Sequence, residues 1–500
     1  MTAPVRTDVP PPAAAPAGRI AAHRRPPSFG RFVAESQARG TLVVQPRMGF
    51  SDPALMRAGL LATKAAADGV VGTMTIDSYT RVNDEPSAVR ALNGGVPLNG
   101  FPLTSYSPHT SHWVLDGVRD AGFPVQIRHG SARPQRIVAA LARLGLDATE
   151  GGPVSYCLPY GRTPLLDSVR NWQETCDFLA GLRGAGAEPH LETFGGCMLG
   201  QLCPPGLLVA ISALEALFFH RAGLRSISLS YAQQTSPAQD RDAVHALRRL
   251  AGELLPDTDW HIVLYTYMGL YPQTRRGSLD LLERSAELAV ETGAARLIVK
   301  TTAEAHRIPT VAENVEALRV ASRAAARHRT GNGTRRVSGP APGADPADNA
   351  VYAEARALVD AVLHLDGDLG QALLKAFARG YLDVPYCLHP DNAGRSRSHI
   401  DASGRLAWSE IGAMPIGHVT DRGRRLTAAG LFEALSFVQR RHDRVVRPAS
   451  SSPPSPSPAP SYAHSSSSSR PPLPPSSRPP LPTAARRPAA HRQHTQEVAP

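Results

Sequence analysis

Short apolar runs alternate with longer amphipathic stretches between about residue 40 and residue 325. The short runs are rich in Val, Ile and Leu and are apolar on both faces, which is typical of strands in a parallel sheet covered by helices. The runs that we expect to form strands are 41–46, 70–76, 96–101, 124–128, 153–157, 189–194, 225–230, 261–267 and 296–300.

The stretches between these runs carry apolar residues at helical spacing. Thr163-Pro164 predicts a helix start, with the threonine as the cap and the proline in the first turn. Another helix is predicted to begin near Ser278 and to stop at Gly293. About eight strand–helix repeats over this length predict a (β/α)₈ TIM barrel. A doubly wound open sheet is the structural alternative.

Composition divides the chain into five segments. Residues 1–27 are a Pro/Ala-rich tail and residues 448–500 a Ser/Pro-rich tail, and both lack the apolar content that offsets ordering entropy, so we expect them to be disordered. Residues 28–327 are the predicted barrel and catalytic domain. The Gly/Pro-rich stretch 328–349 predicts a flexible linker or loop, and 350–447 an α+β extension packed on the barrel.

The formal net charge of +11 lies largely in the two tails. The N-terminal tail contributes +3 and the C-terminal tail +4, which leaves +4 for the rest of the chain. The high pI is therefore no sign of a nucleic-acid partner. No apolar run reaches membrane-spanning length, and the N-terminus lacks the apolar core of a signal peptide.

The five cysteines are odd in number, and no pair has the spacing of zinc ligands. We therefore expect reduced thiols in a cytoplasmic protein and no metal bound directly by this chain.

Three arginines stand at the ends of apolar runs, namely Arg47, Arg81 and Arg128. Because the carboxyl ends of barrel strands meet at one face, we expect their guanidinium groups to converge there. Guanidinium groups bind carboxylates through paired hydrogen bonds, which a lysine cannot make. Other polar or aromatic residues fall at the same ends: Asn99, His129, Tyr156, Phe194, Tyr271 and Lys300.

Such a set predicts a small substrate with more than one negative charge. Glu150 is placed to accept from a substrate ammonium, and Tyr156 and Tyr160 to complete a polar cage, so an amino dicarboxylate fits. A phosphate ester is the competing ligand, but the chain has no G-x-x-x-x-G-K-[ST] loop. No nucleophilic triad is evident, although a Schiff base on Lys300 is conceivable. The cage therefore points to a cofactor that carries the hard chemistry.

Several long motifs, in order along the chain, resemble the catalytic subunit of the glutamate mutase family, also called methylaspartate mutase epsilon. They are QPRMG (45–49), TIDSYTR (75–81), LNGFP (98–102), RHG (128–130), EGGPVSYCLPY (150–160), IVKTTAEAHRIPT (298–310) and LKAFARGYLDVPY (374–386). The resemblance covers about residues 40–445. It implies a TIM barrel that uses adenosylcobalamin to interconvert L-glutamate and (2S,3S)-3-methylaspartate by a radical mechanism.

The resemblance also implies roles for individual residues. Glu150, Arg128 and Lys300 are expected to be catalytic. The expected substrate contacts are Arg47, Arg81, Arg128, His129, Glu150, Tyr156 and Tyr160. The expected cofactor contacts are Gly49, Asn99, Pro159, Tyr271, Lys300, Glu304 and Ile308. Position 271 departs from the family pattern, which has phenylalanine there.

Members of this family share cobalamin with a small subunit that carries a D-x-H-x-x-G loop. Here Asp259-Trp260-His261 is not followed by the glycine and predicts the start of a buried strand. The resemblance therefore implies a small cobalamin-binding partner, with a homodimer of this chain inside a heterotetramer.

Two other functions stay open at this point. A paralogous cobalamin-dependent mutase acting on another amino acid would keep the same radical mechanism. A non-catalytic carboxylate-binding subunit would keep the arginines as ligands only.

Overall fold

The computed structural model describes residues 28–159, 161–198, 202–331, 349–417 and 427–444. Both predicted tails lie wholly outside these ranges, as does most of the predicted linker. Helix α11 (Val311–Gly331) includes the first residues assigned to that linker, so the barrel's last helix is longer than expected.

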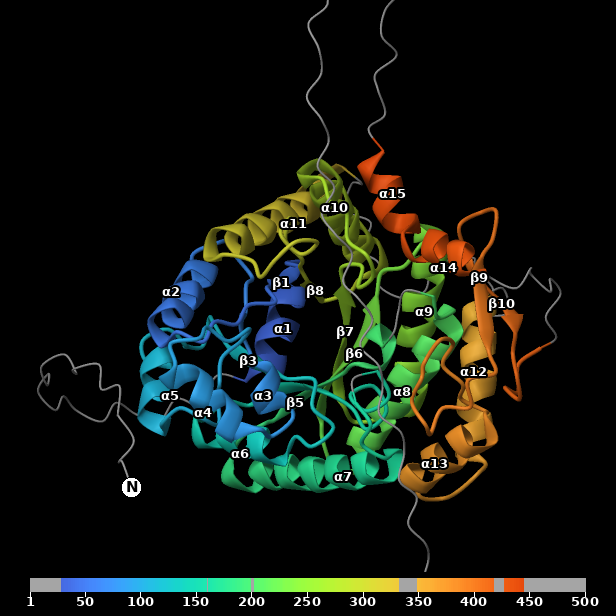
Figure 1. Cartoon of the computed structure of the whole chain (residues 1–500), viewed down its shortest axis with the longest axis horizontal. Helices are drawn as coiled ribbons and strands as arrows, with labels where there is room; N and C mark the ends of the chain where they lie inside the picture. Colours follow the sequence, from blue (N-terminus) through green and yellow to red (C-terminus); the bar gives the residue numbers. More distant parts are fainter. Residues whose placement is uncertain (1–27, 160, 199–201, 332–348, 418–426, 445–500) are drawn as a thin grey trace, which may run out of the picture. The chain divides into compact units, whose positions relative to one another are not determined.

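Eight parallel strands form one sheet in the order β1-β8-β7-β6-β5-β4-β3-β2. A parallel bridge between Val44 of β1 and Val70, just before β2, closes the sheet on itself. The (β/α)₈ TIM barrel is thereby confirmed (Figure 1). The strands are β1 (Val43–Gln45), β2 (Gly72–Thr75), β3 (Val125–Arg128), β4 (Ala148–Gly151), β5 (His190–Thr193), β6 (Ser226–Ala232), β7 (Asp259–Tyr265) and β8 (Arg296–Ile298).

Seven of the nine predicted strands match these positions to within a few residues, and two predictions are wrong. Residues 96–101 form only a single bridge, between Phe101 and Ile76, because Pro97 lacks an N–H and the segment turns at Gly100. The predicted strand at 153–157 is a turn, and the strand lies just before it at β4.

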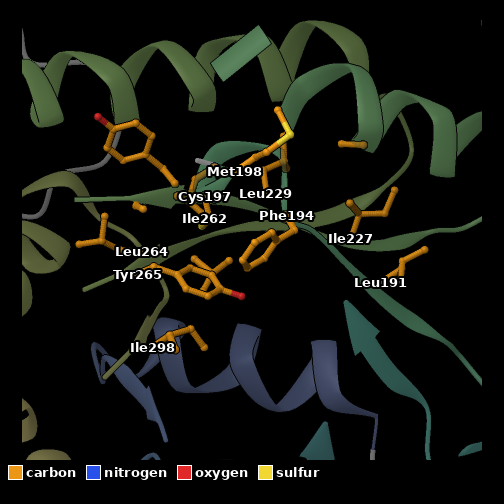
Figure 2. Close-up of a cluster of buried hydrophobic side chains, with 14 of the residues drawn as sticks. Leu191, Phe194, Cys197, Met198, Ile227, Leu229, Ile262, Leu264, Tyr265 and Ile298 are labelled. Carbon is orange, nitrogen blue, oxygen red and sulfur yellow. The ribbon is translucent and has the colours of Figure 1, made fainter. Parts of the chain in front are cut away.

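Side chains alternate between two environments along each strand. Leu191, Ile227 and Leu264 belong to the apolar core, where the strands pack against the helices (Figure 2). Their neighbours Glu192, Ser228 and Tyr265 carry the polar groups of the barrel interior, which hydrogen-bond across strands. The interior is therefore polar, in contrast to the apolar layer outside the strands.

The helices that follow the strands cover the barrel. They are α2 (Pro53–Lys64), α3 (Ser78–Arg81), α4 (Glu85–Asn93), α5 (Pro108–Leu115), α6 (Gln135–Arg143), α7 (Leu165–Gly181), α8 (Pro205–Arg221), α9 (Pro237–Leu254), α10 (Arg275–Thr292) and α11. Two short 3₁₀ turns, η1 (Leu182–Ala185) and η2 (Gly195–Cys197), lie in the connections.

The structure shows where the two helices with predicted boundaries begin and end. Helix α10 ends as expected before Gly293, whose φ of 68° is left-handed, although it begins earlier, after Thr274. The cap expected from Thr163 is wrong. Pro164 occupies the N-cap position of α7, and the Leu165 N–H donates to the Asp391 carboxylate at 2.7 Å.

Helix α1 (Phe29–Ala38) closes the end of the barrel at which the strands begin. Phe29 and Val33 pack with Val43, Val71 and Ala295, which lie at or just before strand starts. The opposite end, where the strands finish, is left to form a site.

The C-terminal part of the chain packs against the barrel helices. Helix α12 (Ala350–Leu363) lies on α8 and α9, as Figure 1 shows on the orange side of the molecule. It is followed by α13 (Leu369–Arg379), the antiparallel pair β9 (Arg397–Ile400) and β10 (Leu406–Glu410), α14 (Ala428–Leu435) and α15 (Phe437–Asp443). The α+β content expected for this extension is confirmed.

All five cysteines are buried and unbridged, as expected. Within the described ranges, no helix has both the length and the apolar content needed to cross a bilayer.

Candidate active site

A cavity of about 350 Å³ opens at the ends of the barrel strands. Its walls come from the loops that follow most of the strands, so residues far apart in sequence meet there. It is lined by Arg47, Met48, Gly49, Thr75, Arg81, Asn99, Arg128, His129, Gly130, Glu150, Tyr156, Phe194, Met268, Glu304, Arg307, Ile308 and Pro309.

The three predicted arginines all line this cavity. Arg128 is the last residue of β3, and Arg47 follows β1 by two residues. Arg81 does not end a strand: β2 stops at Thr75, and Arg81 closes the single helical turn of α3. That turn begins because Asp77 accepts hydrogen bonds from the N–H groups of Tyr79 and Thr80.

Glu150 accepts hydrogen bonds from three side chains of the site. It lies in β4, is buried, and pairs with Arg128 Nε at 2.6 Å. It also accepts hydrogen bonds from the hydroxyl groups of Tyr156 and, at 2.9 Å, Tyr265. Burial acts to lower the pKa of Arg128, but the charge of Glu150 raises that pKa well above its usual value. The Arg128 guanidinium is therefore charged, and the Glu150 carboxyl group holds it in place through their 2.6 Å contact.

Tyr265, at the end of β7, was missed by the sequence analysis. Its hydroxyl contacts Glu150, Glu192 of β5 and, at 3.2 Å, Arg128 Nη2. Its ring stands edge-on to Phe194, with 5.6 Å between centroids, and the two lie side by side in Figure 2. The signal was present, since a tyrosine interrupts the apolar run of that strand, but the run was interpreted as core.

Below Tyr265 lies a buried polar ring that the sequence analysis also missed. Gln45 Nε2 donates to Gln126 at 2.7 Å, and Gln126 donates to Glu192 at 3.2 Å. Arg296 of β8 pairs with Glu192 and donates to Gln45 at 2.5 Å, which completes the ring. The floor of the cavity is thus a network whose charges compensate each other.

His129 is a buried residue of the cavity wall. Its Nδ1 accepts from the Ser131 N–H at 3.0 Å, which places the ring proton on Nε2. That Nε2 is buried and has no hydrogen-bond partner among the described residues. Burial, with the nearby charge of Arg128, lowers the pKa of His129 to about 3, so the ring is neutral. Thr75 Oγ1 is a second buried, unpartnered polar atom in the cavity wall.

Four of the seven predicted cofactor residues line the cavity. They are Gly49, Asn99, Glu304 and Ile308. Asn99 Oδ1 accepts from the Ser78 N–H and hydroxyl at 3.0 and 2.9 Å, which ties it to α3. At Gly49 a side chain has no room, since a Cβ would lie 2.2 Å from the Thr75 carbonyl oxygen.

Lys300 is buried next to Glu304, and Tyr271 is buried next to Lys300. Lys300 Nζ is 4.0 Å from Glu304 and 4.9 Å from the centroid of the Tyr271 ring. Arg47 Nη1 also approaches Glu304, at 3.5 Å. Burial lowers the pKa of Lys300 to about 8, although Glu304 partly opposes the shift. These contacts are long, in contrast to the short hydrogen bonds around Glu150.

Lys300 and Tyr271 are buried and are not among the described residues that line the cavity. Two further predicted residues are not placed there either. Tyr160 lies outside the described residues. Pro159 is half-buried and is not among the cavity-lining residues within the described ranges.

Residues 25–429 match the family described as "Methylaspartate mutase E chain". Two similar proteins are the "Glutamate mutase epsilon subunit" of Escherichia coli O157:H7 and that of Halobacterium salinarum. The first is 30% identical over 79% of this chain and 82% of its own length, and the second is 29% identical over 82% and 86%.

Among solved structures, the YdjI aldolase from Escherichia coli K12 aligns at 12% identity with a TM-score of 0.32. It covers 60% of this chain and 94% of its own. This likeness is too weak to bear on function.

Proposed function

Because this chain belongs to the methylaspartate mutase E chain family, whose name implies an isomerase, we propose that it is the catalytic subunit of a glutamate mutase. Its proposed reaction is the interconversion of L-glutamate and (2S,3S)-3-methylaspartate. The alternative that the sequence left open, a mutase for another amino dicarboxylate, uses the same chemistry and is separated by the substrate test below.

The substrate side carries this proposal. Arg47, Arg81 and Arg128 reach one cavity, and guanidinium groups suit the two carboxylates of glutamate. The His129 Nε2–H adds a neutral donor for a carboxylate oxygen. Glu150 is the acceptor for the substrate ammonium, which would join or displace one of the three donors that it already holds.

The proposed cofactor is adenosylcobalamin, and the residues opposite the arginines suit it. Gly49 gives a bare stretch of backbone, Ile308 offers an apolar side chain that is 55% exposed, and Glu304 and Asn99 offer acceptors for ribose hydroxyls. When bound, the cofactor supplies a carbon-centred radical that abstracts a hydrogen atom from the substrate. The chain's own residues hold the substrate and its fragments in register and limit access of water.

We further propose that a small partner subunit supplies the rest of the cobalamin site. The sequence has one Asp-x-His motif, Asp259-Trp260-His261. It forms the start of β7, and His261 is buried. His261 is therefore held inside a strand and is not on a loop from which it could bind cobalt. The names of the relatives, each an epsilon subunit, agree with a multi-subunit enzyme.

The convergence of three arginines beside the Glu150–Arg128 pair is the observation on which the proposal depends. The test is to mix this chain with a small subunit carrying D-x-H-x-x-G and adenosylcobalamin, and to follow glutamate by proton NMR. Formation of 3-methylaspartate is the expected result. A pair that binds the cofactor but converts only another amino dicarboxylate would support the paralogue, and one that converts none would overturn the proposal.

A further inference from the structure

The last described helix, α15, lies beyond the residues that match the family. The family match ends at residue 429, and α15 spans Phe437–Asp443. It packs on α10, the helix that follows β7, and the two lie beside each other in Figure 1. The segment is therefore attached to one wall of the candidate site rather than to the extension alone.

Asp443 fixes the connection between β7 and α10. Its carboxylate accepts hydrogen bonds from the N–H groups of Gln273 and Thr274, both at 2.9 Å, and from the Thr274 hydroxyl at 2.6 Å. Thr274 is also the N-cap of α10. Gly277 leaves room for this contact, since a Cβ there would lie 2.7 Å from Asp443 Oδ1.

An apolar cluster joins α15 to the same connection. Val438 is buried with Tyr267, Tyr271 and Leu281, and Phe437 packs against the group. Tyr267 and Tyr271 belong to the loop after β7, and Leu281 belongs to α10. The helix therefore supports the loop through side-chain packing as well as through the Asp443 hydrogen bonds.

This loop forms one side of the surroundings of Lys300. The Tyr271 ring lies beneath Lys300 Nζ, and the Tyr271 hydroxyl is 3.4 Å from the Ser278 carbonyl oxygen. The Gln273 carbonyl oxygen is 3.1 Å from His306 Nε2, in the loop that also carries Glu304. Contacts thus run from Asp443 through two loops to the cofactor side of the cavity.

We propose that α15 is a positioning element for the cofactor side of the site, holding Tyr271 against Lys300 through Asp443 and Val438. The role toward the cofactor rests on the proposed function, whereas the contacts of Asp443 and Val438 are features of the structure. In the absence of these contacts the loop after β7 loses its outer support, and Lys300 becomes more exposed to water.

Lysine labelling tests this directly, because the chain has only three lysines, Lys64, Lys300 and Lys375. Lys64 and Lys375 pair with Asp120 and Asp366 away from α15 and serve as internal references. The full-length chain is acetylated with trace acetic anhydride across a pH series, and each lysine is followed by mass spectrometry. Asp443→Ala and Val438→Ala are compared with Arg440→Ala, which changes an exposed residue of the same helix whose guanidinium donates to the Glu433 carbonyl oxygen at 2.9 Å.

We expect the labelling midpoint of Lys300 to rise from about 8 toward the ordinary lysine value of about 10.4 in the first two variants. The midpoints of Lys64 and Lys375, and that of Lys300 in Arg440→Ala, stay unchanged. An unchanged Lys300 midpoint in both test variants overturns the proposal. If Asp443→Ala lowers the melting temperature so far that the labelled protein is unfolded, Asp443→Asn, which keeps one acceptor oxygen, is measured in its place.

A second measurement links α15 to the cofactor. With the small subunit present, adenosylcobalamin affinity is expected to fall about tenfold or more in Asp443→Ala, whereas glutamate affinity changes less than twofold. Equal losses of both affinities, or no loss, contradict a role on the cofactor side. If the unaltered pair binds no cobalamin, the proposed function fails, while the labelling result still decides whether α15 positions Lys300.

Discussion

The two sides of the cavity are built differently. Around Glu150, the charged groups are buried and joined by short hydrogen bonds, with the Arg128 pair at 2.6 Å. Around Glu304, the contacts to Arg47 and Lys300 are 3.5 and 4.0 Å, and Ile308 is largely exposed. The surroundings of Glu150 are thus held by short hydrogen bonds, whereas those of Glu304, to which the proposed substrate ligand Arg47 belongs, are held by longer contacts.

This contrast has a physical meaning. A small charged substrate is held best by groups whose positions are already fixed, because little ordering remains to be done on binding. The cofactor proposed above is large and would bring contacts of its own, which agrees with the longer contacts around Glu304.

Removing one partner of the buried pair is expected to cost most. Arg128→Met leaves Glu150 buried with phenol donors alone, so the free energy of unfolding should fall by about 3–5 kcal/mol. Arg47→Met is the matched control, since its partly exposed, 3.5 Å pair is expected to contribute below about 1 kcal/mol. Urea denaturation of both variants measures the difference. Similar losses would show that the two sides are equally organised.

Lys300 should carry an opposite effect on stability. Its pKa is lowered by burial to about 8 in the folded chain, against about 10.4 when unfolded. The unfolded state therefore binds more protons between these values, so the Lys300 contribution makes stability rise as pH increases from 8 to 10.4. At pH 7 the charged, buried amine is destabilising by about 3 kcal/mol.

Lys300→Met should accordingly be more stable than the unaltered chain at pH 7, and the gap should narrow toward pH 10.4. Thermal or urea unfolding across this range gives the two curves. Parallel curves would mean that Lys300 titrates normally in the folded chain.

Ligand affinities should separate the two sides. Arg128→Lys replaces a guanidinium that binds in two places by a point charge, so glutamate affinity should fall about tenfold to a hundredfold, with cobalamin affinity nearly unchanged. Lys300→Ala should show the reverse. Calorimetry of the chain with its small subunit measures both affinities, and equal losses in either variant would remove the division drawn here.

The smallest effect is expected at Tyr265. Tyr265→Phe removes one hydroxyl from both Glu150 and Glu192, and the cost should be about 1–2 kcal/mol of unfolding free energy. Tyr267→Phe is the control, since that hydroxyl has no hydrogen-bond partner in the described part of the chain. A loss of unfolding free energy no greater than that of the control would show that the Tyr265 hydroxyl does not stabilise Glu150.

The fold was predictable because seven of the eight barrel strands coincide with apolar runs that are separated by helical stretches. The exception is β4, Ala148–Gly151, which carries Glu150. Its polar side chains are satisfied across strands, as when the Thr149 hydroxyl donates to the Ile127 carbonyl oxygen at 2.9 Å. A hydropathy pattern contains no information about hydrogen-bond partners on other strands. The strand was therefore predicted at the apolar residues 153–157, just after β4.

Those apolar residues form a turn for a reason that is also remote in sequence. Glu215 of α8 accepts hydrogen bonds from the N–H groups of Val154, Ser155 and Gly195. Burial raises the pKa of this carboxyl to about 7. The turn that presents Tyr156 is thus held by a residue some sixty positions away, and no local pattern reports it.

The candidate site was predictable in part for the opposite reason. Arg47 and Arg128 stood out because they coincide with other polar residues at the ends of successive apolar runs, whereas Glu304 was assigned by the family resemblance alone; all three line the cavity. Tyr265, Glu192 and Arg296 were missed because they sit inside the apolar runs, where a single polar residue looks like an exception rather than part of a ring.

Helix α8 sets a limit on how this chain can be shortened. Every residue from Pro205 to Phe219 is buried, so the helix has no face suited to water, and α12 of the extension supplies its outer cover. A chain cut after α11 would expose a long apolar cylinder and should aggregate rather than remain as a free barrel. The barrel and its C-terminal extension should therefore be expressed together, as one piece.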